Sequence, residues 1–323
     1  MRILFIGTFF PEIEKQNIIK NSVKSIQNAA NILQWDYIYG LKEFLESDID
    51  LLTKVSVGTF PFGFNKAYIK TQRFYITNFT QGISMGFINF FGLKQLIYPN
   101  LGIKEITEWI KQNDAKEKVL IVYSYLYSNT IIKIKKRFPN IKIILIILDL
   151  PIFTHLDKNN FLYDIKREIE MKNLLESLKF IDGLVCISEH TRDKIDPHHQ
   201  INSIIIEGMV NCNDSYEEKR QGLREYFQFA YTGTLTRKYG ISELVYEFKK
   251  IKRKDVRLVI CGGGELANFV SNESVKDTRI VYKGIVSEEQ ASKIQQQSDI
   301  LLNPRKNDEE YTKYSFPSKN LQY

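Results

Sequence analysis

Short apolar runs alternate with longer amphipathic segments along the whole chain. The runs Arg2–Ile6, Val119–Tyr123 and Val256–Cys261 have the length and β-branched content of buried strands. Between such runs, apolar residues recur every three or four positions, as in the stretch from Ile103 to Ile110. This alternation is typical of parallel sheets covered by helices and predicts an α/β fold.

A polar interval breaks this pattern once, between residues 211 and 226, before the apolar runs resume at Phe227. We therefore predict two doubly wound, Rossmann-like domains, residues 1–210 and 227–323, joined by a linker at 211–226. The remaining predicted strands are Leu51–Val57, Ile141–Leu148, Gly183–Ile187, Ile204–Ile206, Phe227–Tyr231, Arg279–Lys283 and Ile300–Asn303. The predicted helices include one with a stripe of Val23, Ile26, Ala30 and Leu33, one over Ile241–Ile251, and one that a Ser287–Gln290 capping box begins.

Composition excludes several classes of protein. A chain of 323 residues with 43% hydrophobic content is neither disordered nor a small disulfide-stapled peptide. The three cysteines are scattered, and their spacing predicts neither a disulfide framework nor a metal site. No apolar run reaches the roughly 18 residues that a membrane-spanning helix needs. The net charge of +7 favours an anionic partner.

The turn after the first strand of the second half combines a glycine with cations. Gly233 ends this predicted strand, and Arg237 and Lys238 precede the next predicted helix. Glycine lets a ligand approach the backbone closely, and a helix start with neighbouring cations attracts phosphate. The pattern therefore suits a diphosphate site. A tight turn with solvated cations is the alternative that the residues leave open.

A second glycine turn follows the next strand, at Gly262-Gly263-Gly264-Glu265. The carboxyl ends of parallel strands are where open α/β sheets bind ligands. The run lacks the third glycine of a dinucleotide fingerprint, because Ala267 follows Leu266, and no acid ends the next predicted strand. These departures disfavour a dinucleotide oxidoreductase. Glycines that serve only the turn are the alternative.

Five blocks of the second half, taken in order, resemble the donor-binding half of family 4 glycosyltransferases, which are retaining enzymes of GT-B fold. The blocks are YTGTLTRKYGISELVYEF (231–248), LVICGGGE (258–265), YKGIVSEEQ (282–290), SDILLNPR (298–305) and YTKYSFPSKNLQY (311–323). The first half resembles the same family more loosely, through GTFFPE (7–12), ILIILDLP (144–151) and VCISEHTRD (185–193).

The resemblance implies that the second domain binds a nucleotide diphosphate sugar as substrate, with no further cofactor and no metal. Arg237 and Lys238 would bind the diphosphate. Tyr314 and Gln322 match two family glutamates that contact the donor sugar and the ribose, and glutamine can still bond to ribose hydroxyls. Ordinary packing is the alternative for Tyr314. The other residues that the resemblance places at the donor are Gly233, Thr234, Gly262, Gly263, Lys283, Gly284, Ser318 and Lys319.

On the acceptor side the resemblance points to Asp149, which follows a predicted strand where the family commonly presents a His-Asp pair. Leu148 stands in place of the histidine. Asp149 would position an acceptor hydroxyl, and a loop-capping role before Pro151 carries equal weight. Gly7, at the end of the first strand, would face the same cleft.

The segment between Asp50 and Glu105 holds no acidic residue, although it carries six lysines and arginines and eleven phenylalanines and tyrosines. Such a mixture suits an anionic membrane surface, where rings enter the interface and cations meet lipid phosphates. It also suits single-stranded nucleic acid, which is not an expected partner here. Packing of most of these rings inside the first domain is the third interpretation.

The leading hypothesis is a cytoplasmic glycosyltransferase, peripheral at the inner face of the plasma membrane. It would transfer a hexosyl group from a nucleotide sugar to a glycan or lipid-linked acceptor in cell-surface polysaccharide synthesis, with retention. The alternatives are a catalytically silent nucleotide-sugar-binding subunit and a nucleotide-sugar epimerase. Because the last predicted helix has only begun at Tyr323, we also expect that the chain lacks a C-terminal part.

Overall fold

In the computed structural model, apolar runs of the first 209 residues form one eight-stranded sheet. The structure describes residues 1–23, 26, 28–45, 49–76, 79–90, 93–94, 100, 102–112, 115–154, 161–209, 226–305 and 310–315. These residues divide into two units. The first unit holds residues 1–209 and 313–315, and the second holds residues 226–305 and 310–312.

The sheet of the first unit has the order β10-β9-β8-β7-β1-β2-β5-β4. All neighbouring strands in it are parallel except β4, which pairs antiparallel with β5 at one edge. The strands are β1 (Arg2–Gly7), β2 (Ile49–Thr53), β4 (Gln72–Ile76), β5 (Phe79–Ser84), β7 (Lys118–Tyr123), β8 (Lys142–Ile147), β9 (Gly183–Cys186) and β10 (Ser203–Ile205).

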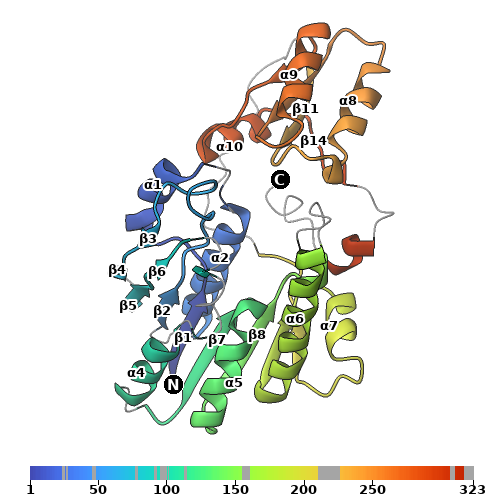
Figure 1. Cartoon of the computed structure of the whole chain (residues 1–323). Coiled ribbons are helices and arrows are strands. Elements are labelled where there is room, and N and C mark those ends of the chain that lie inside the picture. The colour runs from blue at the N-terminus through green and yellow to red at the C-terminus, as the bar shows by residue number, and fades with distance from the viewer. Residues whose placement is uncertain are drawn as a thin grey trace. The chain divides into compact units, whose positions relative to one another are not determined.

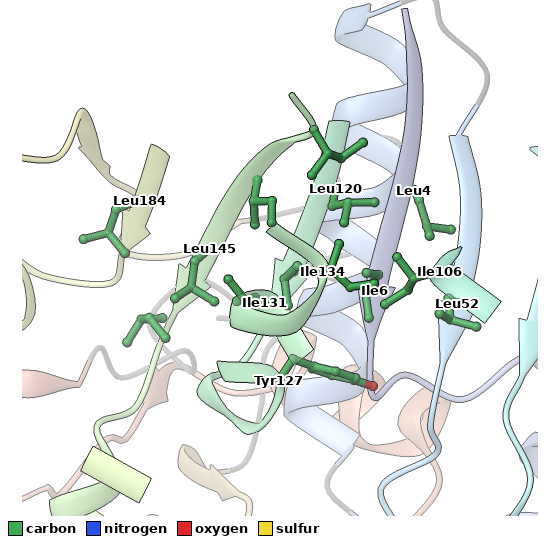
Figure 2. Packing of buried hydrophobic residues seen from close by; sticks show 14 of the residues in the cluster. Leu4, Ile6, Leu52, Ile106, Leu120, Tyr127, Ile131, Ile134, Leu145 and Leu184 are labelled. Carbon is green, nitrogen blue, oxygen red and sulfur yellow. The ribbon is translucent and has the colours of Figure 1, made fainter. Parts of the chain in front are cut away.

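Helices cover both faces of this sheet (Figure 1). They are α1 (Glu12–Asn21), α2 (Asn28–Leu45), α4 (Ile103–Gln112), α5 (Ser128–Arg137), α6 (Phe161–Ser177) and α7 (Glu189–Ile195), with short 3-10 turns η2 (Tyr125–Tyr127), η3 (Pro151–Phe153) and η4 (Leu178–Phe180). Because strand side chains alternate between faces, Leu4 and Ile6 pack in the core under α4 and α5, as Figure 2 shows. Ile3 and Phe5 pack in the opposite core with Ile38 of α2.

Between β2 and α4 the chain builds an insertion that the sequence pattern did not predict. Its strands β3 (Tyr68–Ile69) and β6 (Phe87–Ile88) pair antiparallel as a separate two-stranded sheet. A small core lies beneath them. It combines Phe64, Ile69 and Phe87 of the insertion with Phe10 and with Ile18 of α1, all buried. The strands are only two residues long, too short to give a readable alternation in the sequence.

The second unit is a four-stranded parallel sheet of order β13-β12-β11-β14. Its strands are β11 (Phe227–Thr232), β12 (Val256–Cys261), β13 (Ile280–Tyr282) and β14 (Ile300–Leu301), its helices α8 (Ile241–Lys249), α9 (Ala267–Lys276) and α10 (Glu288–Gln296), and its 3-10 turn is η5 (Arg237–Tyr239). The turn η6 (Glu310–Tyr314) runs from the second unit into the first. Leu258 and Ile260 pack against Val245 and Phe248 of α8.

Most predicted elements are confirmed within a residue or two, including the reciprocal Ser287–Gln290 capping box. Two predictions are wrong. The strand predicted over Leu51–Val57 ends at Thr53, where the chain leaves the sheet for the insertion. The stripe that begins at Val23 is not one helix, because the Val23 amide donates to Gly63 O (3.2 Å) and α2 starts only at Asn28. Of the helices described here, none combines the length and the apolar character needed to cross a bilayer.

Candidate functional site

At the carboxyl edge of the second sheet, the turns after β11 and β12 touch through their backbones. The Gly233 amide donates to Cys261 O and the Leu235 amide to Gly263 O, both at 2.9 Å. Gly262 has a φ of +136°, and a Cβ there would lie 1.8 Å from Gly233 O. Glycine is thus required at position 262 by the close approach of two chains, which supports the turn interpretation at that residue.

The next two residues offer donors to a ligand. Among the described residues, the amides of Gly263 and Gly264 have no acceptor, although they directly precede the turn into α9. Unpaired amides before a helix are a common binding site for phosphate oxygens. The structural role of Gly262 and a ligand role for its neighbours are therefore compatible.

Two cationic residues lie on the neighbouring turn, which follows β11. The backbone amide of Arg237 donates to Glu265 Oε1 (2.8 Å), which ties the turn after β11 to the turn after β12. Arg237 is exposed, and its guanidinium forms no ion pair within the described part of the chain. The Lys238 ammonium lies 3.8 Å from the ring centroid of Tyr311, whose hydroxyl donates to Lys238 O. Arg305, after β14, faces the same ring at 5.0 Å.

The turn after β13 joins the same edge. Gly262 N donates to Gly284 O (2.7 Å), and the Tyr282 hydroxyl donates to Gly262 O (2.9 Å). Lys283 is exposed, and its amide donates to Ile260 O (3.0 Å). The structure thus brings together eight of the predicted donor residues: Gly233, Thr234, Arg237, Lys238, Gly262, Gly263, Lys283 and Gly284.

Four predicted donor residues remain, and the structure describes only Tyr314 among them. Ser318, Lys319 and Gln322 lie outside the described residues. Tyr314 packs in the first unit, where its ring stacks on Phe153 with centroids 4.7 Å apart and meets His190 edge-on at 6.3 Å. This placement supports the packing interpretation of Tyr314.

At the carboxyl edge of the first sheet, Gly7 ends β1 and Asp149 follows β8, with β7 between them. Gly7 is tightly packed, because a Cβ there would lie 2.4 Å from Gln34 Oε1, and its carbonyl accepts from the Tyr127 hydroxyl (2.8 Å). Asp149 is exposed. Burial, with a further contribution from the Asp149 carboxylate, holds the pKa of Tyr123 well above its usual value. Asp149 therefore acts electrostatically on the end of β7.

Two features of this edge have no signal in the sequence. Ser124, directly after β7, has a φ of 94°, which is uncommon for a residue other than glycine and often marks a functional position. Lys54, directly after β2, is buried with its ammonium 4.6 Å from the Phe87 centroid. Burial, and then the nearby charge of Lys94, lowers the pKa of Lys54 to about 6.

The described cysteines, Cys186 and Cys261, are buried free thiols, and burial raises their pKa values to about 12 and about 11. Within the residues that the structure describes, His, Cys, Asp and Glu side chains form no group of three that could hold a metal ion.

Solved structures similar to this chain include GT-B glycosyltransferases. Sucrose-phosphate synthase from Thermosynechococcus elongatus matches with a TM-score of 0.61 and 13% identity over 94% of this chain and 76% of that chain. The E. coli trehalose-6-phosphate synthase bound with UDP-2-fluoro glucose matches with a TM-score of 0.63 and 12% identity, over 94% of this chain and 78% of that chain. Anabaena Alr3699/HepE in complex with UDP matches with a TM-score of 0.54 and 10% identity, over 94% of this chain and 74% of that chain.

No protein-family model and no curated protein sequence matches the chain. At 10 to 13% identity the structural similarity establishes the fold. The chain has the GT-B fold, as the five sequence blocks predicted.

Proposed function

We propose that this chain transfers a glycosyl group, of hexosyl type, from a nucleotide diphosphate sugar to a glycan or lipid-linked acceptor of a cell-surface polysaccharide, with retention at the anomeric carbon. The observation that carries the proposal is the cluster of Arg237, Lys238 and the unbonded Gly263 and Gly264 amides at one sheet edge. Complexes of GT-B neighbours with UDP and with UDP-2-fluoro glucose support a donor of this kind.

In this proposal the bond between the anomeric carbon and the diphosphate oxygen breaks, and the oxygen keeps the electron pair. A bond forms from the acceptor hydroxyl oxygen to the same carbon, and the hydroxyl proton passes to the departing diphosphate oxygen. Charge therefore develops on the diphosphate, where the Arg237 guanidinium, the Lys238 ammonium and the glycine amides would stabilise it. Asp149, in the first unit, would orient the acceptor hydroxyl.

Calorimetry with UDP, GDP and ADP tests the donor site in the full chain. We expect the double variant Arg237→Ala and Lys238→Ala to bind the preferred nucleotide diphosphate at least about tenfold more weakly, equivalent to about 1.4 kcal/mol. The matched control is Arg253→Ala with Lys254→Ala, another Arg-Lys pair, which precedes β12 at the opposite edge of the same sheet. Equal affinity for the two double variants would remove Arg237 and Lys238 from the site.

The packing of Tyr314 within the first unit favours one alternative, a nucleotide-sugar-binding subunit without turnover, because this position matches a family glutamate. Incubation with radiolabelled donor and cell-envelope acceptors separates the two functions. Incorporation of label supports the transferase, and donor binding without incorporation supports the binding subunit. Conversion of the donor alone to an epimeric sugar would instead indicate an epimerase.

A further inference from the structure

The insertion of the first unit exposes apolar side chains on one face of its small sheet. Tyr68 of β3 and Ile88 of β6 are directly paired, and they are 57% and 42% exposed. Their neighbours Ile69 and Phe87, also paired, point to the small core below. Alternation along both strands therefore gives this sheet one buried face and one open face.

Further aromatic rings lie on the segments that flank this small sheet. Phe60 and Phe90 form an isolated bridge with ring centroids 5.4 Å apart, and Phe62, at the tip of the adjacent turn, is 81% exposed. The segments are held in place by the buried Asn89, whose side-chain amide donates to Gly58 O (2.8 Å) and Lys66 O (3.2 Å). These hydrogen bonds thus fix the backbone segments that carry the rings.

The charges on this face are all positive. Lys70 directly follows β3, and Lys66 lies two residues before it. Both are exposed, and the Lys66 ammonium donates to Asn17 Oδ1 of α1 (3.0 Å). No acidic residue occurs between Asp50 and Glu105 in the sequence. The face continues onto the end of α1, where the Asn65 amide donates to Asn21 O (2.8 Å).

The end of α1 has the same character, since its last turn carries Lys20 and the exposed Ile19. Of the two acids of α1, Glu14 is buried, and Glu12 lies in the first turn at the other end of the helix. Neither acid of α1 therefore lies exposed at the end of the helix that adjoins the insertion.

We propose that this aromatic-basic surface, made of Phe60, Phe62, Lys66, Tyr68, Lys70, Ile88 and Phe90, docks on the headgroup region of an anionic phospholipid bilayer. Exposed rings and aliphatic side chains would enter the interface, and the lysines would meet lipid phosphates. Single-stranded nucleic acid would use the rings and cations, but it has no use for exposed aliphatic residues such as Ile88, Ile19 and Leu93. Only the role of this docking rests on the proposed function: it would bring the enzyme to a lipid-linked acceptor.

Co-sedimentation of the full chain with vesicles tests the proposal. We expect binding to vesicles of phosphatidylcholine and phosphatidylglycerol (70:30), and much weaker binding to phosphatidylcholine alone. Phe62→Ser with Phe90→Ser should lower the partition coefficient at least about fivefold, and Lys66→Gln with Lys70→Gln about tenfold or more. The control variants are Phe44→Ser, whose ring on α2 is 86% exposed, and Arg253→Gln with Lys254→Gln, and both should bind like the wild type.

The proposal is overturned if the wild type does not sediment with anionic vesicles, if the surface variants bind as the controls do, or if the chain binds a poly-U oligonucleotide while ignoring vesicles. Nucleotide diphosphate affinity, measured by calorimetry without lipid, should be equal in all these variants. A chain that binds vesicles but no nucleotide would contradict the proposed function and leave the docking surface standing.

Discussion

Gly262 and Gly284 both have a positive φ at the carboxyl edge of the second sheet, but their surroundings differ. A Cβ on Gly262 would meet Gly233 O at 1.8 Å, whereas a Cβ on Gly284 would have no atom within 4 Å. We expect Gly284→Ala to cost about 1 kcal/mol for the backbone conformation alone. Gly262→Ala should cost about 3 kcal/mol, because the two turns must also separate.

Urea unfolding of both glycine variants, followed by circular dichroism, measures the difference. Nucleotide diphosphate affinity should fall for Gly262→Ala, because the Gly263 amide moves with the turn, and should change less for Gly284→Ala. Equal stability of the two variants would show that the turns after β11 and β12 are not in the tight contact described.

At the residue scale the sequence offered more candidate residues for the carboxyl edge of the second sheet than for that of the first. Gly262, Arg237 and Lys238 can be recognised in the sequence, because glycine and neighbouring cations after an apolar strand are typical of phosphate-binding turns. Lys54 and Ser124 cannot be recognised in this way. A lysine becomes unusual only through its burial, and a serine only through its φ of 94°, and both are properties of the folded chain.

Among the elements, a single carboxylate links β1, β2 and α4. Asp50 is buried, and its Oδ2 accepts from Trp109 Nε1 (2.7 Å) and Arg2 Nε (3.1 Å). We expect Asp50→Ala to lower the free energy of unfolding by about 2 to 3 kcal/mol, since it removes the carboxylate that accepts from a buried indole N–H and from a half-buried guanidinium. Trp109→Phe removes one hydrogen bond and keeps the ion pair, so it should cost less than Asp50→Ala. Chemical denaturation of both variants gives the comparison, and a larger loss for Trp109→Phe would show that ring packing, not the carboxylate, joins these elements.

Helices and strands were predictable where the apolar pattern extends over many residues. The central parallel strands are continuous apolar runs because both faces of each strand are buried, and α4 keeps a clear stripe of Ile106, Trp109 and Ile110. The insertion was missed because β3 and β6 are short and their partners are set by tertiary contacts. A tertiary contact also explains why the helix predicted from Val23 does not form: the Val23 amide donates to Gly63 O of the insertion.

For the whole molecule, the GT-B fold follows from two α/β units, each with candidate residues at the carboxyl edge of its own sheet. The sequence predicted two domains because the strand-helix rhythm occurs twice. The roles of the two edges are chemically different in the proposed function. Cations and amides of the second unit would hold the donor, and Asp149 of the first would act only on the acceptor hydroxyl.

This division of labour predicts that binding and turnover respond to different edges. Asp149→Asn keeps the size of the side chain and removes its charge, so nucleotide diphosphate affinity should stay within about twofold, while transfer to acceptor falls about tenfold or more. Calorimetry and a radiolabelled transfer assay on the same preparations measure both quantities, with Glu43→Gln, an exposed carboxylate of α2, as the control. If Asp149→Asn weakens donor binding as much as transfer, its carboxylate serves the donor. If neither changes, Asp149 only caps the loop before Pro151, and the acceptor must be positioned by other groups at that edge, among which the strained Ser124 is the first to substitute.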